Sequence, residues 1–467
     1  MGQMVEVGTA LGVIRGQVEG DVAYFRGVPY ALSPVGERRF APPVPARPWR
    51  GTFDATQFAV APSEGSTDID PLTSSLFLNI TAPYPLPADA PICIYLHGGG
   101  FISGTPNSPV TEGTALARKG FVAVTASYRV GIDGFGHVPG APNNRGVLDI
   151  LLALRTIAGL SESLQGRLNP LYLVGHSAGG TLALAVMGSP SLDVSLAGIW
   201  CSSARIRGVT PAESVDMVQR LSRALGVTAS REGLERFDRA QLSAVERRID
   251  RPSSTLPLAR RLAESASTFG PITDDVAVAG SLIGGVRRAL GAGVPLFLGM
   301  TTDEATATIS LDTNLKNRST RSMLRAAGAD DDHIDSIMLR DTGDAARALG
   351  RWVTDLRYLS PFSKALDDLA ECPGAAVWAY RYGVPRLRDG LAAHGEDVPA
   401  LFGTSVEHSG PGVQELHDRF ISFLSGSHAP WPKYTTARRS VLSVNYEASI
   451  VADGYSQERL IKSPRWV

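Results

Sequence analysis

Short apolar runs alternate with longer amphipathic segments through most of the chain. The apolar runs are rich in β-forming residues and are typical of buried strands: Ile92–Leu96, Phe121–Ala126, Leu171–Val174, Leu196–Trp200, Val294–Leu298 and Ala375–Arg381. Helical spacing of apolar residues occupies the intervals between the first four of them: Val110–Lys119, Gly146–Ala158 and Ala178–Met187. This alternation predicts an α/β fold with a central, mostly parallel sheet and helices on both faces.

One long segment breaks the alternation. From about Pro211 to Leu290 the pattern is that of amphipathic helices rich in Arg and Glu, with no clear strand. We expect a helical insertion over residues 205–290 within a single domain spanning residues 1–467. Such an insertion either covers a functional site or packs over one face of the sheet, and the sequence leaves both alternatives open.

Composition and charge narrow the class of protein. The 467 residues carry 45 Lys and Arg against 46 Asp and Glu, so a general binder of nucleic acid or of anionic membranes is excluded. The three cysteines, at unrelated spacings, form neither a disulfide framework nor a zinc pattern. No secretory signal is readable at the N-terminus. We therefore expect a cytoplasmic protein with no membrane partner, whereas its oligomeric state is unreadable from sequence.

The strongest chemical signal is the G-x-S-x-G run Gly175–Gly179, centred on Ser177. It lies between a predicted strand and a predicted helix, where a very tight turn exposes the serine hydroxyl and points the next backbone N–H at a substrate. Ser177 is therefore a candidate nucleophile. The alternative is an incidental turn of small residues.

A second glycine-rich turn, His97–Phe101, directly follows the strand Ile92–Leu96. Consecutive glycines allow several backbone N–H groups to converge on one oxyanion. We predict an oxyanion hole made by the N–H groups of Gly99, Gly100 and Ala178, and we expect His97 to hold this loop by hydrogen bonds without catalysing.

A serine nucleophile of this kind needs an acid and then a histidine, in that order along the chain. Asp303 and Glu304 both follow the strand Val294–Leu298, and the one not used is expected to be a solvated neighbour. His394 and His408 both follow the strand Ala375–Arg381. Position along the chain favours His394 over His408. It nevertheless leaves both choices open, that of the acid and that of the histidine.

The acidic run Asp330–Asp332 precedes His333 and suggests a metal cluster at first sight. Acids in the first turn of a helix are the commoner explanation, because they interact favourably with the helix dipole. No second set of ligands at suitable spacing accompanies the run. We therefore predict a helix start and expect neither a metal nor another cofactor.

Taken together, these segments resemble the type-B carboxylesterase family of α/β-hydrolases, which includes para-nitrobenzyl esterases and cholinesterases. The resemblance extends in order along nearly the whole chain through these motifs: Phe25–Ala31, Arg39–Pro43, Trp49–Gly51, Leu76–Ile80, Gly98–Phe101, Tyr128–Gly131, Asn144–Asp149, Gly175–Gly180, Gly299–Ala305, His394–Glu396, Leu401–Gly403 and Trp431–Tyr434. It implies the α/β-hydrolase fold, with the helical insertion covering the site.

The resemblance also implies a triad of Ser177, Glu304 and His394, with Glu304 chosen over Asp303 and His394 over His408. Two further residues are tentative substrate contacts, Phe101 and His176. His176 departs from the family, which usually has an acidic or amide residue immediately before the nucleophile.

The implied activity is hydrolysis of small to medium uncharged carboxylic esters through an acyl-enzyme, and the expected partner is a small-molecule ester substrate. Carbamates or amides are alternative substrates. An acyltransferase, a lactone-forming enzyme or a lyase could use the same site, and a binding module without catalysis is the non-enzymatic alternative. The sequence does not distinguish the physiological substrate, because hydrophobic pockets discriminate homologous acyl groups only weakly.

Overall fold

The computed structural model describes residues 3–62, 75–165, 168–250, 255–264, 269–310, 319–340, 344–404, 410–427 and 431–461. Their strands form one large sheet. The strands are β1 (Gln3–Thr9), β2 (Gly12–Glu19), β3 (Val22–Pro29), β4 (Thr52–Asp54), β5 (Phe77–Pro83), β6 (Ile92–Leu96), β7 (Val122–Ala126), β8 (Leu171–His176), β9 (Gly198–Ser202), β10 (Leu296–Thr301), β11 (Val377–Tyr382), β12 (Val441–Val444) and β13 (Ala448–Val451).

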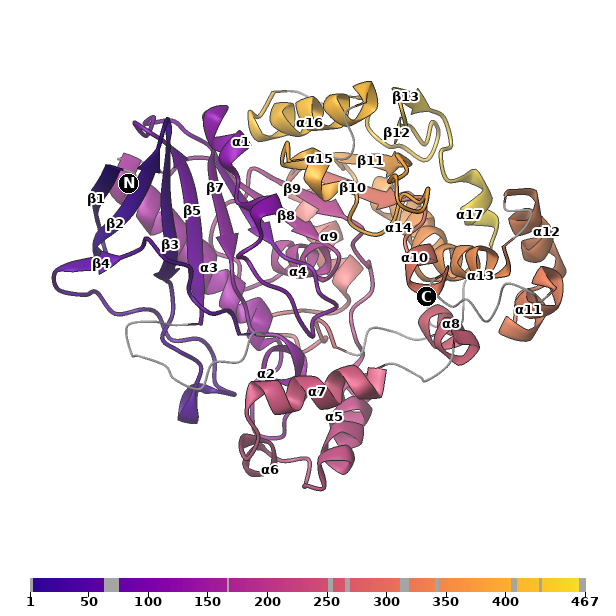
Figure 1. Cartoon of the computed structure of the whole chain (residues 1–467), viewed down its shortest axis with the longest axis horizontal. Coiled ribbons are helices and arrows are strands. Elements are labelled where there is room, and N and C mark those ends of the chain that lie inside the picture. The colour runs from indigo at the N-terminus through magenta and orange to yellow at the C-terminus, as the bar shows by residue number, and fades with distance from the viewer. Residues whose placement is uncertain are drawn as a thin grey trace.

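The sheet is mostly parallel at its centre and antiparallel at its ends. Its order is β1-β2-β3-β5-β7-β6-β8-β9-β10-β11-β12-β13, with β4 paired to β2. The strands from β7 to β12 in this order pair in parallel, and the outer strands pair antiparallel except for β4, which pairs in parallel with β2. Figure 1 shows the sheet running across the molecule with helices around it. The predicted α/β class is confirmed.

The helices are α1 (Thr114–Arg118), α2 (Gly131–Phe135), α3 (Arg145–Gln165), α4 (Ala178–Met187), α5 (Pro211–Leu225), α6 (Arg231–Glu235), α7 (Arg239–Asp250), α8 (Thr255–Glu264), α9 (Leu282–Gly291), α10 (Thr306–Ser310), α11 (Thr320–Ala327), α12 (Asp331–Arg340), α13 (Ala345–Thr354), α14 (Ser360–Ala370), α15 (Val398–Leu401), α16 (Pro411–Leu424) and α17 (Ser456–Leu460). The predicted helix over Val110–Lys119 is shorter than expected. Gly113, at φ 88°, interrupts it, because a β-carbon there would lie 2.2 Å from the β-carbon of Ala123.

Side chains of the central strands alternate between two hydrophobic cores, as the two-residue repeat of a strand requires. In β6, Ile92 and Ile94 pack in a core with residues of α3, α4, α9 and α14. The alternate residues Cys93 and Tyr95 pack in a second core with residues of α1 and α16. The two faces of the sheet are therefore both covered, and its functional groups are confined to the strand ends.

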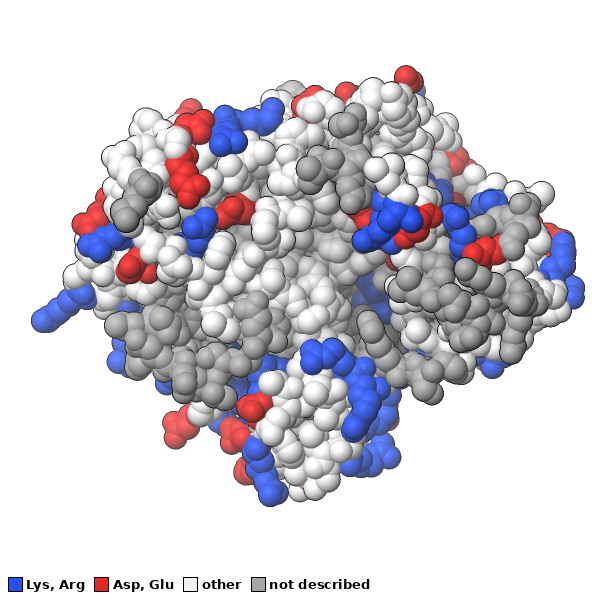
Figure 2. All heavy atoms as spheres, in the orientation of Figure 1, with Lys and Arg blue, Asp and Glu red and all other residues white. Residues whose placement is uncertain are grey.

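Helices α5 to α9 occupy the interval between β9 and β10, where the insertion was expected. Helices α5, α6 and α7 form a lobe at the bottom of the view in Figure 1. Lys and Arg side chains predominate around this lobe in Figure 2. Helix α9 differs from the rest, since Gly285 packs closely against Gly188 at the end of α4 and places α9 in the layer that covers the sheet.

A second group of helices, α10 to α13, lies between β10 and β11, and of these only the start of α12 was predicted. Apolar residues of these helices and of α8 form a separate small core that includes Ile309, Leu324, Ile334 and Leu349. The helices lie at the right of Figure 1. They follow Glu304 directly, so this group borders the predicted site.

Candidate active site

Ser177 occupies a strained turn between β8 and α4. Its backbone has φ 56° and ψ −120°, a combination that costs a non-glycine residue about 1–3 kcal/mol. A β-carbon at Gly175 would lie 2.3 Å from the carbonyl oxygen of Gly179, and one at Gly179 would lie 2.1 Å from that of Leu96. Ser177 stands at the N-cap of α4, yet its side chain makes no capping hydrogen bond. Both glycines are thus required sterically, and the serine hydroxyl is not used to cap the helix.

The loop after β6 is held by His97. Its ring stacks on that of Tyr128 at a centroid distance of 4.3 Å, and the Tyr128 hydroxyl donates a 2.7 Å hydrogen bond to the His97 carbonyl oxygen. The His97 Nδ1 lies 2.8 Å from the carbonyl oxygen of Gly98. Burial lowers the pKa of His97 to about 4, so the ring is neutral at pH 7. His97 therefore supports the loop through the hydrogen bonds that were predicted.

The predicted oxyanion donors lie on two neighbouring segments. Gly99 (φ 120°) and Gly100 (φ 63°) form a tight turn in which the N–H groups of Ile102 and Ser103 both donate to the Gly99 carbonyl oxygen at 3.1 Å. Among the described residues, no acceptor is paired with the N–H of Gly99 or Gly100. Ala178 is the first residue of α4, where a backbone N–H has no partner within its own helix.

His394 and Glu304 are in direct contact, although 90 residues separate them along the chain. The His394 Nδ1 faces the Glu304 Oε2. The Glu304 side chain is fully buried, and its Oε1 accepts hydrogen bonds of 2.7 Å from the Thr301 N–H and the Ser203 hydroxyl. The His394 side chain remains 27% exposed. The carboxylate is thus fixed on one side of the imidazole, and Nε2 is left for another partner.

Ser203 is a site residue that the sequence analysis missed. It follows β9, has φ 52° and donates to the carboxylate that contacts the histidine. The available signal was its position after a buried strand, at the edge of the sheet where the other candidates follow their strands.

Asp303 has a different role from Glu304, and it is not the solvated neighbour that was expected. It is 5% exposed, and its carboxylate lies 2.9 Å from an Arg351 guanidinium nitrogen. Its Oδ2 also accepts a hydrogen bond from the Ala392 N–H at 3.2 Å. The expectation was wrong because the chain leading to His394 packs directly onto Asp303. Asp303 therefore anchors the histidine loop.

His176 lies between the two loops that flank the serine. A β-carbon at Gly98 would lie 2.9 Å from the His176 Nδ1 and 3.2 Å from the Ser177 β-carbon, and one at Gly395 would lie 3.0 Å from the His176 Nε2. The His176 and His394 rings are 4.7 Å apart. Burial, and then the charge of His394, hold the pKa of His176 well below its usual value. A neutral imidazole thus joins the serine turn, the glycine loop and the histidine loop.

The charge state of His394 depends on its neighbours. Burial alone lowers its pKa, but Tyr358 and Glu304 outweigh burial and raise the pKa to about 9. The Tyr358 ring lies 5.5 Å from that of His394. His394 is therefore mainly protonated at pH 7 in the protein without substrate.

Two other predicted residues are placed as follows. Phe101 is 2% exposed, and its ring packs 4.6 Å from that of Phe135, so it supports the glycine loop; its contact with substrate stays a prediction. His408, the alternative histidine, lies outside the described residues.

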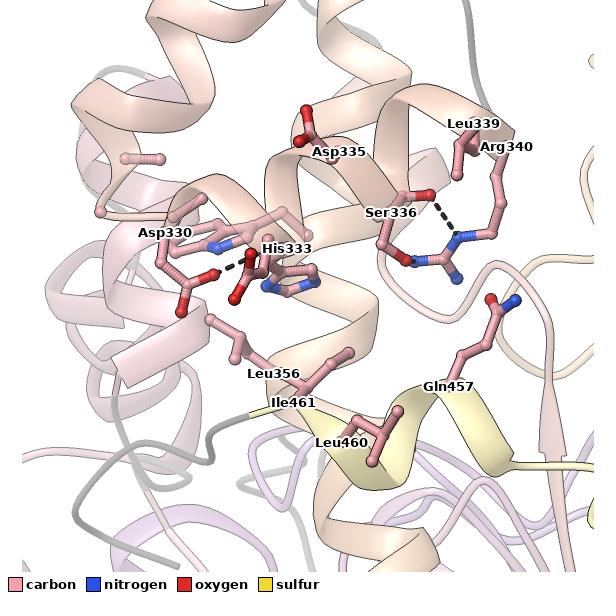
Figure 3. A pocket seen from close by; sticks show the side chains of 15 residues that line it. Asp330, His333, Asp335, Ser336, Leu339, Arg340, Leu356, Gln457, Leu460 and Ile461 are labelled. Atoms are coloured by element: carbon pink, nitrogen blue, oxygen red, sulfur yellow. Dashed lines mark hydrogen bonds between the residues drawn. The ribbon is translucent and has the colours of Figure 1, made fainter.

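The acidic run forms a helix start, as predicted. Helix α12 begins at Asp331, and the Asp330 side chain accepts a 2.9 Å hydrogen bond from the His333 N–H. The His333 Nε2 lies 3.0 Å from the buried carboxylate of Asp355. Figure 3 shows Asp330 and His333 together beside a cavity of about 710 Å³. In the part of the chain that the structure describes, no group of three or more His, Cys, Asp or Glu residues is arranged to hold a metal.

None of the helices formed by the described residues combines the length and the apolar composition needed to cross a membrane.

Comparison with known proteins gives a consistent result along the whole chain. Residues 3–461 match the family model described as the carboxylesterase family. The fumonisin B1 esterase of Sphingopyxis macrogoltabida is 28% identical over 91% of this chain and 84% of its own length. The para-nitrobenzyl esterase of Bacillus subtilis (strain 168) is 24% identical over 97% of both chains. A crystal structure of a Geobacillus stearothermophilus carboxylesterase aligns with a TM-score of 0.80 and 23% identity over 97% of this chain and 99% of its own.

Proposed function

Since the chain belongs to the carboxylesterase family and is a carboxylic-ester hydrolase, we propose that Ser177, His394 and Glu304 form its catalytic triad. The observation that carries this proposal is the contact between the His394 Nδ1 and the buried Glu304 carboxylate. That contact fixes the tautomer of the imidazole and leaves Nε2 to accept a proton. The contacts of His176 bring the His394 loop to the turn that presents Ser177.

In the proposed acylation step, the His394 Nε2 takes the hydroxyl proton of Ser177 while the serine oxygen bonds to the ester carbonyl carbon. The carbonyl oxygen becomes an oxyanion, which the N–H groups of Gly99, Gly100 and Ala178 stabilise. The carbon–oxygen bond to the alcohol then breaks, and the alcohol leaves with the proton held by His394. Glu304 stabilises the imidazolium and keeps its own charge throughout.

Deacylation repeats these roles with water. His394 removes a proton from a water molecule, whose oxygen bonds to the acyl carbon of the acyl-enzyme. The bond to Ser177 breaks, the serine recovers its proton from His394, and the carboxylic acid is released. Hydrolysis of para-nitrophenyl butyrate by the wild-type protein and by Ser177→Ala tests this proposal, because only the serine forms the covalent intermediate.

We propose carboxylic esters of small or medium size as the substrate class. The names of two relatives refer to esters of different kinds, fumonisin B1 and a para-nitrobenzyl compound. A family site of this type therefore accepts different leaving groups, and the sequence-based prediction of uncharged esters is the starting point for assays.

The proposed oxyanion hole makes a specific mutational prediction. A β-carbon at Gly99 would lie 2.0 Å from the carbonyl oxygen of Ser103, so Gly99→Ala must displace the turn and its N–H groups. We expect kcat for para-nitrophenyl butyrate to fall by about 10²–10³, with a smaller change in KM, because these donors act mainly on the transition state.

Gly20→Ala is the matched control. Gly20 has φ 63°, and a β-carbon there would meet no other atom within 4 Å, so this variant incurs the left-handed backbone cost far from the site. It should keep wild-type kcat. An effect of Gly99→Ala confined to KM would contradict the role of the loop in the transition state.

The raised pKa of His394 predicts the pH dependence of activity. The proposed base must be unprotonated, so kcat/KM should rise with pH through a midpoint near pH 9. The same shift affects stability, because the pKa of His394 in the folded protein exceeds the unfolded value of about 6.5. Protonated His394 therefore stabilises the fold, and this contribution is complete below about pH 6.5 and is lost as the pH rises to about 9. Initial rates between pH 5.5 and 10, corrected with Ser177→Ala, measure the profile, and a kcat/KM already constant from about pH 6 would contradict it.

A further inference from the structure

A polar cavity of about 440 Å³ lies where three strands of the sheet end. Three of its lining residues each directly follow a strand: Thr302 follows β10, Gly383 follows β11 and Asn445 follows β12. These strands pair in parallel, so their carboxyl ends meet at one edge of the sheet, and ligands of open α/β sheets bind outside that edge. Among the described residues that line the cavity, none belongs to the proposed triad. The cavity is therefore a candidate site separate from the one that binds the ester.

Three arginines from different elements line this cavity. They are Arg340 of α12, Arg351 of α13 and Arg381 of β11, and their side chains are 15–20% exposed. The described lining residues include no Asp or Glu. The remaining polar side chains of the lining belong to Thr302, Ser443 and Asn445. The lining therefore combines three cations with hydroxyl and amide donors.

The carboxylate partners of these arginines are buried outside the lining. Arg340, Arg351 and Arg381 form ion pairs of 2.7, 2.9 and 2.9 Å, and the partners, in the same order, are Asp355, Asp303 and Glu458. These carboxylate side chains are at most 7% exposed. The charges of the pairs balance overall. Only the positive member of each pair lines the cavity, however, so the pairs together give the cavity a positive potential.

Arg340 also keeps a donor without an acceptor. Its Nη2 contacts the Asp355 carboxylate at 2.7 Å, and its Nε donates to the Ser336 carbonyl oxygen at 3.2 Å (Figure 3). Among the described residues, the Arg340 Nη1 has no hydrogen-bond acceptor, since the Glu458 Oε1 is 3.9 Å away. The Arg381 Nη2 lies 2.9 Å from the same oxygen, so two guanidinium groups converge there. A bound anion gives Nη1 an acceptor and reduces the repulsion between the two cations.

We propose that this cavity binds a phosphate dianion, either as inorganic phosphate or as the phosphoryl group of a small phosphate monoester. Guanidinium groups bind phosphate through pairs of parallel N–H bonds. Three guanidinium groups offer more charge and more donors than the two oxygens of a carboxylate engage, whereas a phosphoryl group carries nearly two charges and three acceptor oxygens. This site goes beyond the proposed esterase function, because it binds a ligand that contains no carboxylic ester.

Isothermal titration calorimetry of the wild-type protein tests the proposal with two probes, inorganic phosphate and glycerol 3-phosphate. At about pH 8, where both are dianions, and at low ionic strength, we expect a Kd below about 1 mM for at least one of them. Sodium chloride at matched ionic strength is the control and should give no saturable binding. A lower Kd for inorganic phosphate identifies the free ion as the ligand, and a lower Kd for glycerol 3-phosphate identifies the monoester.

Ser443→Asp tests the position of the site without removing an ion pair. Ser443 lines the cavity, and a carboxylate there repels a bound anion. We expect phosphate to bind about tenfold or more weakly to this variant. Ser195→Asp is the matched control, because Ser195 is exposed and precedes β9 at the opposite, amino edge of the sheet. It should bind phosphate as the wild type does.

Arg340→Gln removes one of the three cations and leaves neither of its carboxylates without a partner. Asp355 keeps its 3.0 Å contact with the His333 Nε2, and Glu458 keeps its ion pair with Arg381. The variant should therefore fold, which its melting temperature checks, and should bind phosphate about tenfold or more weakly. A Kd above about 1 mM for both probes in the wild type, or an unchanged Kd in both Ser443→Asp and Arg340→Gln, overturns the phosphate site. Neither result affects the proposed esterase mechanism, because the titrations contain no ester and the role of Ser177 is tested by hydrolysis alone.

Discussion

Replacing Ser177 with alanine should lower kcat for para-nitrophenyl butyrate by about 10⁶, because no other group in the proposed mechanism forms the acyl-enzyme. The variant should fold normally. The strained backbone of residue 177, at φ 56°, is set by the turn between β8 and α4, and alanine has the same steric requirements there as serine. The Ser177 side chain makes no capping hydrogen bond to α4, so the change removes no support from the helix.

A control for this result is Ser422→Ala on α16. The Ser422 hydroxyl donates to the Asp418 carbonyl oxygen within the same helix and is exposed, so kcat and the melting temperature should both stay close to wild type. Circular dichroism and thermal unfolding of Ser177→Ala establish that its loss of activity is not a loss of fold. Retention of more than about 1% of wild-type kcat in a correctly folded Ser177→Ala protein would refute the nucleophile.

Glu304→Gln should lower kcat by about 10³–10⁴. The glutamine oxygen can still accept the hydrogen bonds from the Thr301 N–H and the Ser203 hydroxyl, which leaves the amide nitrogen facing the His394 Nδ1. An amide N–H there favours the tautomer in which Nδ1 accepts and Nε2 carries the proton, and that tautomer cannot receive a proton from Ser177. The removal of the carboxylate charge should also lower the midpoint of the kcat/KM profile below pH 9.

Asp303→Asn is the matched control for the acid. Asp303 directly precedes Glu304 and is similarly buried. Its carboxylate, however, pairs with Arg351 and accepts a hydrogen bond from the Ala392 N–H. We expect a lower melting temperature and a kcat within about tenfold of wild type, because the triad contact itself is retained. A larger loss of kcat in Asp303→Asn than in Glu304→Gln would assign the acid to Asp303.

Local features of this protein were predictable from sequence because they depend on neighbouring residues. The apolar runs gave β6, β7, β8, β9, β10 and β11 to within a few residues, and the helical spacing gave α3 and α4. The turn at Ser177 was predictable for the same reason: the glycines at 175 and 179 are the ones that the close backbone approaches require. The prediction of helix α1 was less accurate, since the start of this helix depends on the contact of Gly113 with Ala123 on strand β7.

Contacts between distant segments were not predictable in this way. Composition and spacing left Asp303 and Glu304 equivalent, and only the packing of the histidine loop turns one carboxylate toward His394 and the other toward Arg351. The role of Ser203 depends likewise on the adjacency of β9 and β10 in the sheet.

The sequence by itself determined the class of fold, the strained serine turn and the glycine loop that precedes it, because each depends on a short run of residue types. The tertiary structure alone decided which acid meets the histidine. The physical reason is that Glu304 and His394 are 90 residues apart along the chain, and they meet only where the folded chain packs the histidine loop against the residues that follow β10.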